Sequence, residues 1–297
     1  MANLEQLTAP AYAVGESPVW RAAEAALYWV DIPSRRIHRL HPETGQADSW
    51  ATPEMAACIA FNAKGVVIAG LESGVFSLKL EPGGTASATR LAAPVFPLPN
   101  MRFNDGRCDR QGRFWAGTMH MDMAAGHGVG SLYRYSARYG LSGPVQGGLF
   151  TQNGLAWSPS GDRMYLSDSH PKSRLIWMYD YDKDVGTPRN RRVFVDMNLH
   201  PGRPDGAAVD ADGCYWTCAN DAGRLMRFTP AGVLDRTIEL PVKKPSMCAF
   251  GGKKLYTLYV TTIRPKSEAE LTDQPLAGAV FSLRPGVQGL PEPEFGL

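Results

Sequence analysis

Short apolar runs recur along the whole chain, and Gly, Pro, Asp or Asn residues separate them. Many of the runs alternate apolar and polar residues, and others are continuously apolar and rich in aromatic side chains. Runs of this kind, bounded by turn-forming residues, predict β-strands. Helical periodicity does not persist beyond about two turns anywhere, so we expect almost no helix. The pattern therefore predicts an all-β protein.

The apolar runs belong to a longer repeat. In one unit, Asp205 leads into an apolar run that ends at Val209, a turn follows at Gly213, and an aromatic run occupies residues 214–217. Comparable units begin at Glu16, Ala57, Asp105, Asn153 and Ser246. Their spacing of about 40–50 residues is typical of propeller blades. Further apolar runs complete most units, so we predict a six-bladed β-propeller of four-stranded blades.

The propeller is expected to form a single domain over residues 1–297, with residues 7–14 supplying a strand to the last blade. A closed ring of blades limits the number of exposed sheet edges. Two packed β-sandwiches are the alternative architecture. The regular repeat, without a break in composition, argues against them.

Composition narrows the classes of partner. The 297 residues include 44% hydrophobic and 20% charged residues, and the net charge is +2. This balance gives no electrostatic reason to expect nucleic acid or a membrane surface as partner. No apolar run approaches the roughly 20 residues of a membrane helix, and the N-terminus does not resemble a signal peptide. Five cysteines, an odd number, favour reduced thiols and a cytoplasmic location.

The six equivalent positions at the start of each unit suggest chemistry. They are occupied by Glu16, Ala57, Asp105, Asn153, Asp205 and Ser246. In a propeller the first strand of each blade lines the central channel, so these side chains should meet at one mouth. Carboxylates gathered there would repel one another unless a cation neutralises them. Oxygen ligands favour calcium, magnesium or manganese, with zinc or iron(II) as alternatives in an open site.

Each of these residues also has an ordinary structural interpretation. Asp-Gly and Asn-Gly are common turn dipeptides, so a single pair usually marks only a turn. Arg102 could stabilise a developing oxyanion, or it could form an ion pair with a nearby carboxylate. Asn104 could bind a substrate hydroxyl, or it could cap its turn. No Gly-x-Ser-x-Gly motif and no Gly-rich phosphate loop accompanies them.

Several motifs together resemble a known family. They are Gly-Glu-Ser-Pro-Val-Trp at 15–20, Leu-Tyr-Trp-Val-Asp at 27–31, Arg-Phe-Asn-Asp-Gly at 102–106, Trp-Ala-Gly-Thr-Met at 115–119, Asn-Gly-Leu-Ala-Trp-Ser at 153–158, Pro-Asp-Gly at 204–206 and Cys-Ala-Phe-Gly-Gly at 248–252. The set resembles the senescence-marker-protein/gluconolactonase family, which includes regucalcin and bacterial sugar lactonases. The resemblance covers nearly the whole chain, and the motifs follow the family order.

The resemblance implies a six-bladed propeller that holds one divalent metal, with calcium as the first choice. By position, the implied metal ligands are Glu16, Asn153 and Asp205. The partner is then a small-molecule sugar lactone, which the enzyme hydrolyses to the aldonic acid. Asp205 would act as the general base toward water, and Arg102 would stabilise the oxyanion.

The resemblance also implies how substrate is bound. Arg102 and Asn104 match the family's substrate-binding pair, and Asp122 lies where some members place an acidic substrate contact. The flanking His120 and Met121 depart from the Ala-Glu-Glu pattern of the animal proteins. Residues 35–40 and Thr118-Met119-His120 look more like the bacterial sugar lactonases.

Three other functions remain open from the sequence. A metal-dependent ester or phosphotriester hydrolase would use the same fold with a more apolar pocket. A calcium-binding regulator without catalysis is also compatible with the regucalcin resemblance. A scaffold for protein binding is the third, but it gives no reason to align Glu16, Asn153 and Asp205. The sequence leaves the sugar and the oligomeric state open, a monomer included.

Overall fold

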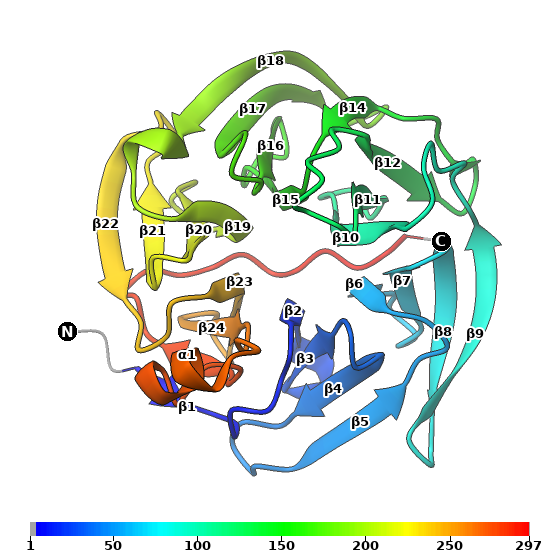
Figure 1. The fold of residues 1–297 in the computed structure, drawn as a ribbon. Coiled ribbons are helices and arrows are strands. Elements are labelled where there is room, and N and C mark those ends of the chain that lie inside the picture. Colours follow the sequence, from blue (N-terminus) through cyan, green and yellow to red (C-terminus); the bar gives the residue numbers. More distant parts are fainter. Residues whose placement is uncertain (1–3, 297) are drawn as a thin grey trace.

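The computed structural model describes residues 4–296, and Figure 1 shows its sheets arranged in a ring around a central axis. This is the arrangement of a β-propeller, so the predicted all-β propeller fold is confirmed. The three inner strands of each blade form an antiparallel meander in which consecutive strands pair from the centre outward. Among the described residues, the only α-helix is the short α1 (Glu268–Asp273), with 3₁₀ turns at Ala22–Glu24 and Met197–Leu199.

Strand pairing groups residues 4–296 into five sheets rather than the six separate sheets that the repeat predicts. The largest has eight strands: β2 (Gly15–Arg21), β3 (Ala26–Asp31), β4 (Arg36–Leu40), β5 (Ala47–Ala51), β6 (Ala56–Phe61), β7 (Val67–Leu71), β8 (Val75–Glu81) and β9 (Thr85–Ala92). It consists of two four-stranded meanders, β2–β5 and β6–β9. A single parallel residue pair, Ala51 with Thr85, joins their outer strands.

The next sheet contains β10 (Met101–Cys108), β11 (Phe114–His120) and β12 (Gly130–Ser136), and both β13 (Gly140–Leu141) and β14 (Gln146–Leu149) pair with β12. Two four-stranded sheets follow: β15 (Gln152–Trp157), β16 (Arg163–Asp168), β17 (Leu175–Asp182) and β18 (Thr187–Asp196), then β19 (Arg203–Val209), β20 (Tyr215–Asn220), β21 (Arg224–Phe228) and β22 (Leu234–Glu239). The last sheet combines β23 (Pro245–Gly251), β24 (Thr257–Thr262) and β25 (Phe281–Leu283) with β1 (Glu5–Gln6).

The ring closes through the N-terminal strand. β1 pairs with β25, with Glu5 opposite Ser282 and Gln6 opposite Phe281. The predicted closure by an N-terminal strand is therefore confirmed, but its position at residues 7–14 is wrong. Pro10 lies within that segment and has no N–H to donate to a ladder. Within residues 7–14, the N–H of Leu7 donates to the carbonyl of Val280 at 2.9 Å and Val14 forms an isolated antiparallel bridge with Ile263, but the segment forms no strand.

The core lies between the blades, where each sheet is covered on both faces. The second strands carry its largest buried side chains, among them Trp29, Trp115 and Trp216. Strands buried on both faces are continuously apolar rather than alternating. This explains the aromatic runs in the sequence. The structure contains no helix in residues 4–296 that is long and apolar enough to cross a membrane.

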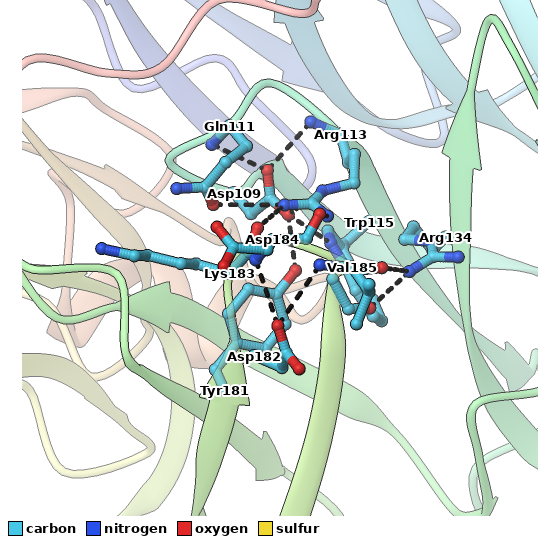
Figure 2. Close-up of polar contacts among 11 residues, drawn as sticks. Asp109, Gln111, Arg113, Trp115, Arg134, Tyr181, Asp182, Lys183, Asp184 and Val185 are labelled. Carbon is cyan, nitrogen blue, oxygen red and sulfur yellow. Dashed lines mark hydrogen bonds and ion pairs between the residues drawn. The ribbon is translucent and has the colours of Figure 1, made fainter.

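The turn after each first strand is fixed by polar contacts at one end of the ring. Figure 2 shows this for Asp109, whose carboxylate accepts hydrogen bonds from the backbone N–H of Gln111 at 3.0 Å and of Arg113 at 2.9 Å. Trp115 Nε1 and the Tyr181 hydroxyl also donate to it. Asp210 plays the same part after β19. The opposite ends of the first strands are left to form the candidate site.

The C-terminal segment crosses the ring at this turn-bearing end, as the red trace in Figure 1 shows. Gly289 pairs with Asp210, and the N–H of Phe295 donates to the carbonyl of Phe61 at 2.7 Å. Glu292 Oε1 lies 2.8 Å from Arg107 Nε, beneath the central channel. We refer to residues 288–296 as the C-terminal strap. It covers the channel at the end away from the candidate site.

Candidate functional site

The predicted metal-binding residues lie near the beginnings of three first strands. Glu16 is in β2, Asn153 in β15 and Asp205 in β19, and all three are buried. The expectation that they precede their strands is wrong, because the strands begin one or two residues earlier. Pairing with the second strand shifts register directly after Glu16 and Asn153, and across Asp205. Bulges of this kind re-aim side chains and are frequent next to active sites.

Register also corrects one of the six equivalent positions. The last residue pair before the hairpin turn is Cys108 with Phe114 in the β10–β11 hairpin and Val209 with Tyr215 in the β19–β20 hairpin, so Cys108 and Val209 are equivalent. Counting back four residues from each gives Asn104 and Asp205. Asn104, rather than Asp105, is therefore the equivalent of Asp205, and Asp105 lies one residue further into the strand. The sequence alone favours matching the two Asp-Gly pairs, at 105–106 and 205–206, and so predicts the wrong residue.

Glu16 and Asp205 influence each other electrostatically. Burial raises the pKa of Glu16 well above its usual value, and the neighbouring Asp205 and Asp105 carboxylates raise it further. Burial likewise raises the pKa of Asp205 to about 7, while Arg203 and a hydrogen bond from Asn220 oppose the increase. Carboxylates this close disfavour simultaneous ionisation unless positive charge is supplied. The site therefore favours a bound cation.

Asn153 supplies the third oxygen. Its Oδ1 is buried without a hydrogen-bond partner in the part of the chain that the structure describes. An unpaired buried carbonyl oxygen is costly, and a metal ion would satisfy it. Among residues 4–296 no group of three His, Cys, Asp or Glu side chains could hold a metal ion. A metal here would consequently depend on the Asn153 amide together with Glu16 and Asp205, a donor set that fits a hard divalent cation.

Arg102 and Asn104 lie beside this group on β10. Arg102 Nη1 donates to Asn104 Oδ1 at 2.9 Å and to the carbonyl of Phe103 at 2.7 Å. The guanidinium thus bonds to an amide and a backbone carbonyl, and it lowers the pKa of Glu16 through space. Burial lowers the pKa of Arg102 to about 10, so it remains cationic at neutral pH. Asn104 Nδ2 donates to the carbonyl of Gln152 at 2.7 Å, which orients the amide across two blades.

Asp122 lies apart from these residues, on the loop between β11 and β12. Its side chain is exposed, and Oδ1 accepts hydrogen bonds from the N–H of Ala124 at 3.0 Å and of Ala125 at 3.3 Å. His120 Nδ1 lies 3.2 Å from the carbonyl oxygen of Asp122. The loop also packs on the next blade, since His170 Nε2 is 2.9 Å from the Met123 carbonyl. Contact between Asp122 and a substrate stays a prediction.

Sequence reasoning missed the residue that orients Asp205. Asn220, at the end of β20, donates from Nδ2 to Asp205 Oδ2 at 2.6 Å. It is 1% exposed, so this contact is shielded from water. Asp31 and Asp168 end the second strands of other blades and also make buried polar contacts. A search for polar residues at the ends of second strands would have found Asn220.

Comparison with known proteins gives a consistent result. Residues 14–264 match the family model described as the SMP-30/Gluconolactonase/LRE-like region. The 6-deoxy-6-sulfogluconolactonase of Pseudomonas putida is 39% identical, over 95% of this chain and 94% of that protein. Regucalcin of Danio rerio is 35% identical, over 94% and 93%. The pentonolactonase of Haloferax volcanii is 32% identical, also over 94% and 93%.

Solved structures agree with these sequence matches. A luciferin-regenerating enzyme superposes with a TM-score of 0.92 at 27% identity, covering 100% of both chains. Regucalcin of Agrobacterium tumefaciens, described as a calcium-binding protein, superposes with a TM-score of 0.90 at 27% identity, covering 98% of this chain and 97% of that one. The similarity therefore extends over the whole ring, including the strands that carry the candidate site.

Proposed function

Because this chain belongs to the SMP-30/gluconolactonase/LRE-like family, we propose that it is a metal-dependent hydrolase that opens a sugar lactone to the aldonic acid. The observation that carries the proposal is the group of buried oxygen donors at one end of the channel. Glu16 and Asp205 have raised pKa values, and Asn153 Oδ1 has no hydrogen-bond partner among residues 4–296. The relatives named as sulfogluconolactonase and pentonolactonase support the reaction class.

In this proposal Glu16, Asn153 and Asp205 hold one divalent metal. The metal, when bound, would act as a Lewis acid toward the lactone carbonyl. Calcium is the first choice because all three donors are oxygens and because a structural relative is described as calcium-binding. Zinc, manganese, magnesium and iron(II) are the alternatives to be compared by experiment.

The residues around the metal have different roles in the proposed reaction. Asp205 accepts a proton from the attacking water, and Asn220 keeps its carboxylate oriented for this role. The cationic Arg102 faces the negative charge that develops on the carbonyl oxygen. Asn104 binds a sugar hydroxyl next to Arg102. Asp122 contacts the substrate from the loop between β11 and β12. No covalent intermediate is required.

The proposal includes the architecture. We count six blades, because β2–β5 and β6–β9 are complete meanders joined by one residue pair only. The first strands support this count, since β2, β6, β10, β15, β19 and β23 contact one another in turn and β23 contacts β2. Ring closure by β1 supports a single domain over residues 1–297.

The choice of sugar can be tested directly. Hydrolysis would be followed with a pH indicator on pentonolactones, gluconolactone and 6-deoxy-6-sulfogluconolactone, after chelation and after each metal is restored. We expect activity to disappear with the chelator and to return with one metal. Metal binding without turnover of any lactone would favour a calcium-binding regulator, which the regucalcin relatives make the second candidate. Turnover of aryl esters alone would favour the ester hydrolase.

A variant tests the role of Asp205. Asp205→Asn should lower kcat on the order of 10²-fold or more at saturating metal, because it removes the general base. Asp212→Asn is the matched control, since this exposed carboxylate follows the same strand at the opposite end of the ring. Its activity should equal that of the wild type. The mechanism fails if Asp205→Asn retains full activity with metal bound.

A further inference from the structure

The bulge that carries Asn153 is fixed from two neighbouring strands. The N–H of Leu155 donates to Asp105 Oδ2 at 3.1 Å, across the interface with β10. The hydroxyl of Tyr215, on β20, donates to the carbonyl of Gly154 at 2.8 Å. This carbonyl and the N–H of Leu155 belong to the same peptide unit. Side chains from two other blades therefore fix both polar atoms of the peptide between Gly154 and Leu155.

The local backbone fits no side chain in place of Gly154. Its φ of +63° lies in the left-handed region. A Cβ there would lie 2.4 Å from the Tyr215 hydroxyl and 2.5 Å from Ser167 Oγ. Tyr215 is 0% exposed and Asp105 is 3% exposed, so water does not compete for their hydrogen bonds. The peptide consequently has one orientation in this environment.

A neighbouring blade offers an internal comparison. Ser17 lies one residue after Glu16, as Asp105 lies one residue after Asn104, and Ser17 Oγ accepts a hydrogen bond from the N–H of Ile59 at 2.9 Å. This is the equivalent contact between blades. It holds a bulge at Ala57, whose methyl side chain cannot bind a metal. At the Asn153 bulge, by contrast, the Asp105 carboxylate and the buried Tyr215 hydroxyl both bind the backbone, and this bulge carries an oxygen donor.

We propose that Asp105 and Tyr215 are positioning residues, which fix the 154–155 peptide so that the Asn153 amide oxygen faces the metal. The inference rests on the proposed function, because it takes Asn153 as a ligand. Neither residue needs to touch metal or substrate. Removing either contact should let the 154–155 peptide rotate. Metal binding should then weaken, although the three donor side chains are unchanged.

Calorimetric titration of the chelator-treated full-length protein with calcium chloride tests this proposal, with manganese chloride as a second series. Tyr215→Phe removes one hydrogen bond without changing charge, so its metal Kd should rise about two- to tenfold. Tyr181→Phe is the matched control, because that buried hydroxyl donates to Asp109, as Figure 2 shows, and Asp109 follows β10 at the end away from the candidate site. Its Kd should match the wild type even where its thermal stability falls.

Two variants of Asp105 separate its hydrogen bond from its charge. Asp105→Asn keeps an acceptor for the N–H of Leu155, whereas Asp105→Ala removes it, and both lack the charge. We expect the Kd of Asp105→Ala to exceed that of Asp105→Asn at least about twofold. An unchanged Kd in Tyr215→Phe, with clear binding by the wild type, overturns the inference alone. If neither metal binds, zinc, magnesium and iron(II) are titrated in the same way, and failure of the wild type to bind any of the five overturns the proposed function and this inference together.

Discussion

A partly buried side chain can make the stability of this protein depend on pH, and His38 is an example away from the candidate site. Its ring stacks on Trp29, with centroids 5.4 Å apart, and contacts Tyr12. Burial lowers the pKa of His38 to about 4, while Asp31 opposes the decrease. The aromatic surroundings thus favour the neutral imidazole.

The free energy of unfolding should therefore depend on His38 between about pH 6.5 and 4. The unfolded chain takes up the proton near pH 6.5, and the folded protein does so only near pH 4. Stability is fully present above this window and is lost as the pH falls, by up to about 3 kcal/mol. Urea unfolding of the wild type and of His38→Phe at pH 7 and pH 4.5 measures the difference. Equal losses in both proteins would contradict the assignment, and His127→Gln, at an exposed histidine, serves as control.

At the scale of single elements, the hairpin between β19 and β20 depends on Asp210. Its Oδ1 accepts from the N–H of Asp212 and of Cys214, both at 3.0 Å. Its Oδ2 accepts from Trp216 Nε1 and from Arg227 Nε, both at 2.8 Å. The carboxylate is 0% exposed, so its removal would leave several buried donors unpaired.

Asp210→Ala should lower the free energy of unfolding by about 3 kcal/mol or more. Asp212→Ala is the comparison, since it removes a carboxylate that pairs with the same arginine but is 65% exposed. That change should cost less than about 1 kcal/mol. Chemical denaturation of both variants measures the two losses. Similar values would mean that the ion pairs, rather than the turn and the indole contact, carry the stability.

Hairpins such as this one explain which parts of the fold could be predicted. The Gly turns and aromatic second strands follow from local chemistry, so their positions were visible in the sequence. The bulges were not, because Asn-Asp-Gly at 104–106 and Asp-Gly at 205–206 look alike until strand pairing fixes their register. The contact between Asn220 and Asp205 likewise requires that register. The count of six blades stays a prediction. The parallel pair of Ala51 with Thr85 joins two meanders into one sheet, and such a backbone pair leaves no signal in the sequence.

For the molecule as a whole, the two ends of the chain have different structural roles. The N-terminal β1 completes the last sheet, which closes the ring. The C-terminal strap crosses the other end of the channel and contacts several blades, through Asp210, Phe61 and Arg107. Because the strap covers that end, substrate is expected to enter at the end that carries Glu16, Asn153 and Asp205.

The ion pair between Arg107 and Glu292 is one of the polar contacts that anchor the strap to the channel wall. Arg107 is 7% exposed, and its Nη1 also donates to the carbonyl of Ala207 at 2.7 Å. Glu292→Ala would leave a buried guanidinium without its counter-charge, so we expect the free energy of unfolding to fall by about 3–5 kcal/mol. The double variant Glu292→Ala/Arg107→Met removes the unpaired charge and should recover part of that loss. Chemical denaturation of both measures the recovery. A loss below about 1 kcal/mol in Glu292→Ala would mean that backbone hydrogen bonds, such as that from Phe295 to Phe61, hold the strap without the ion pair.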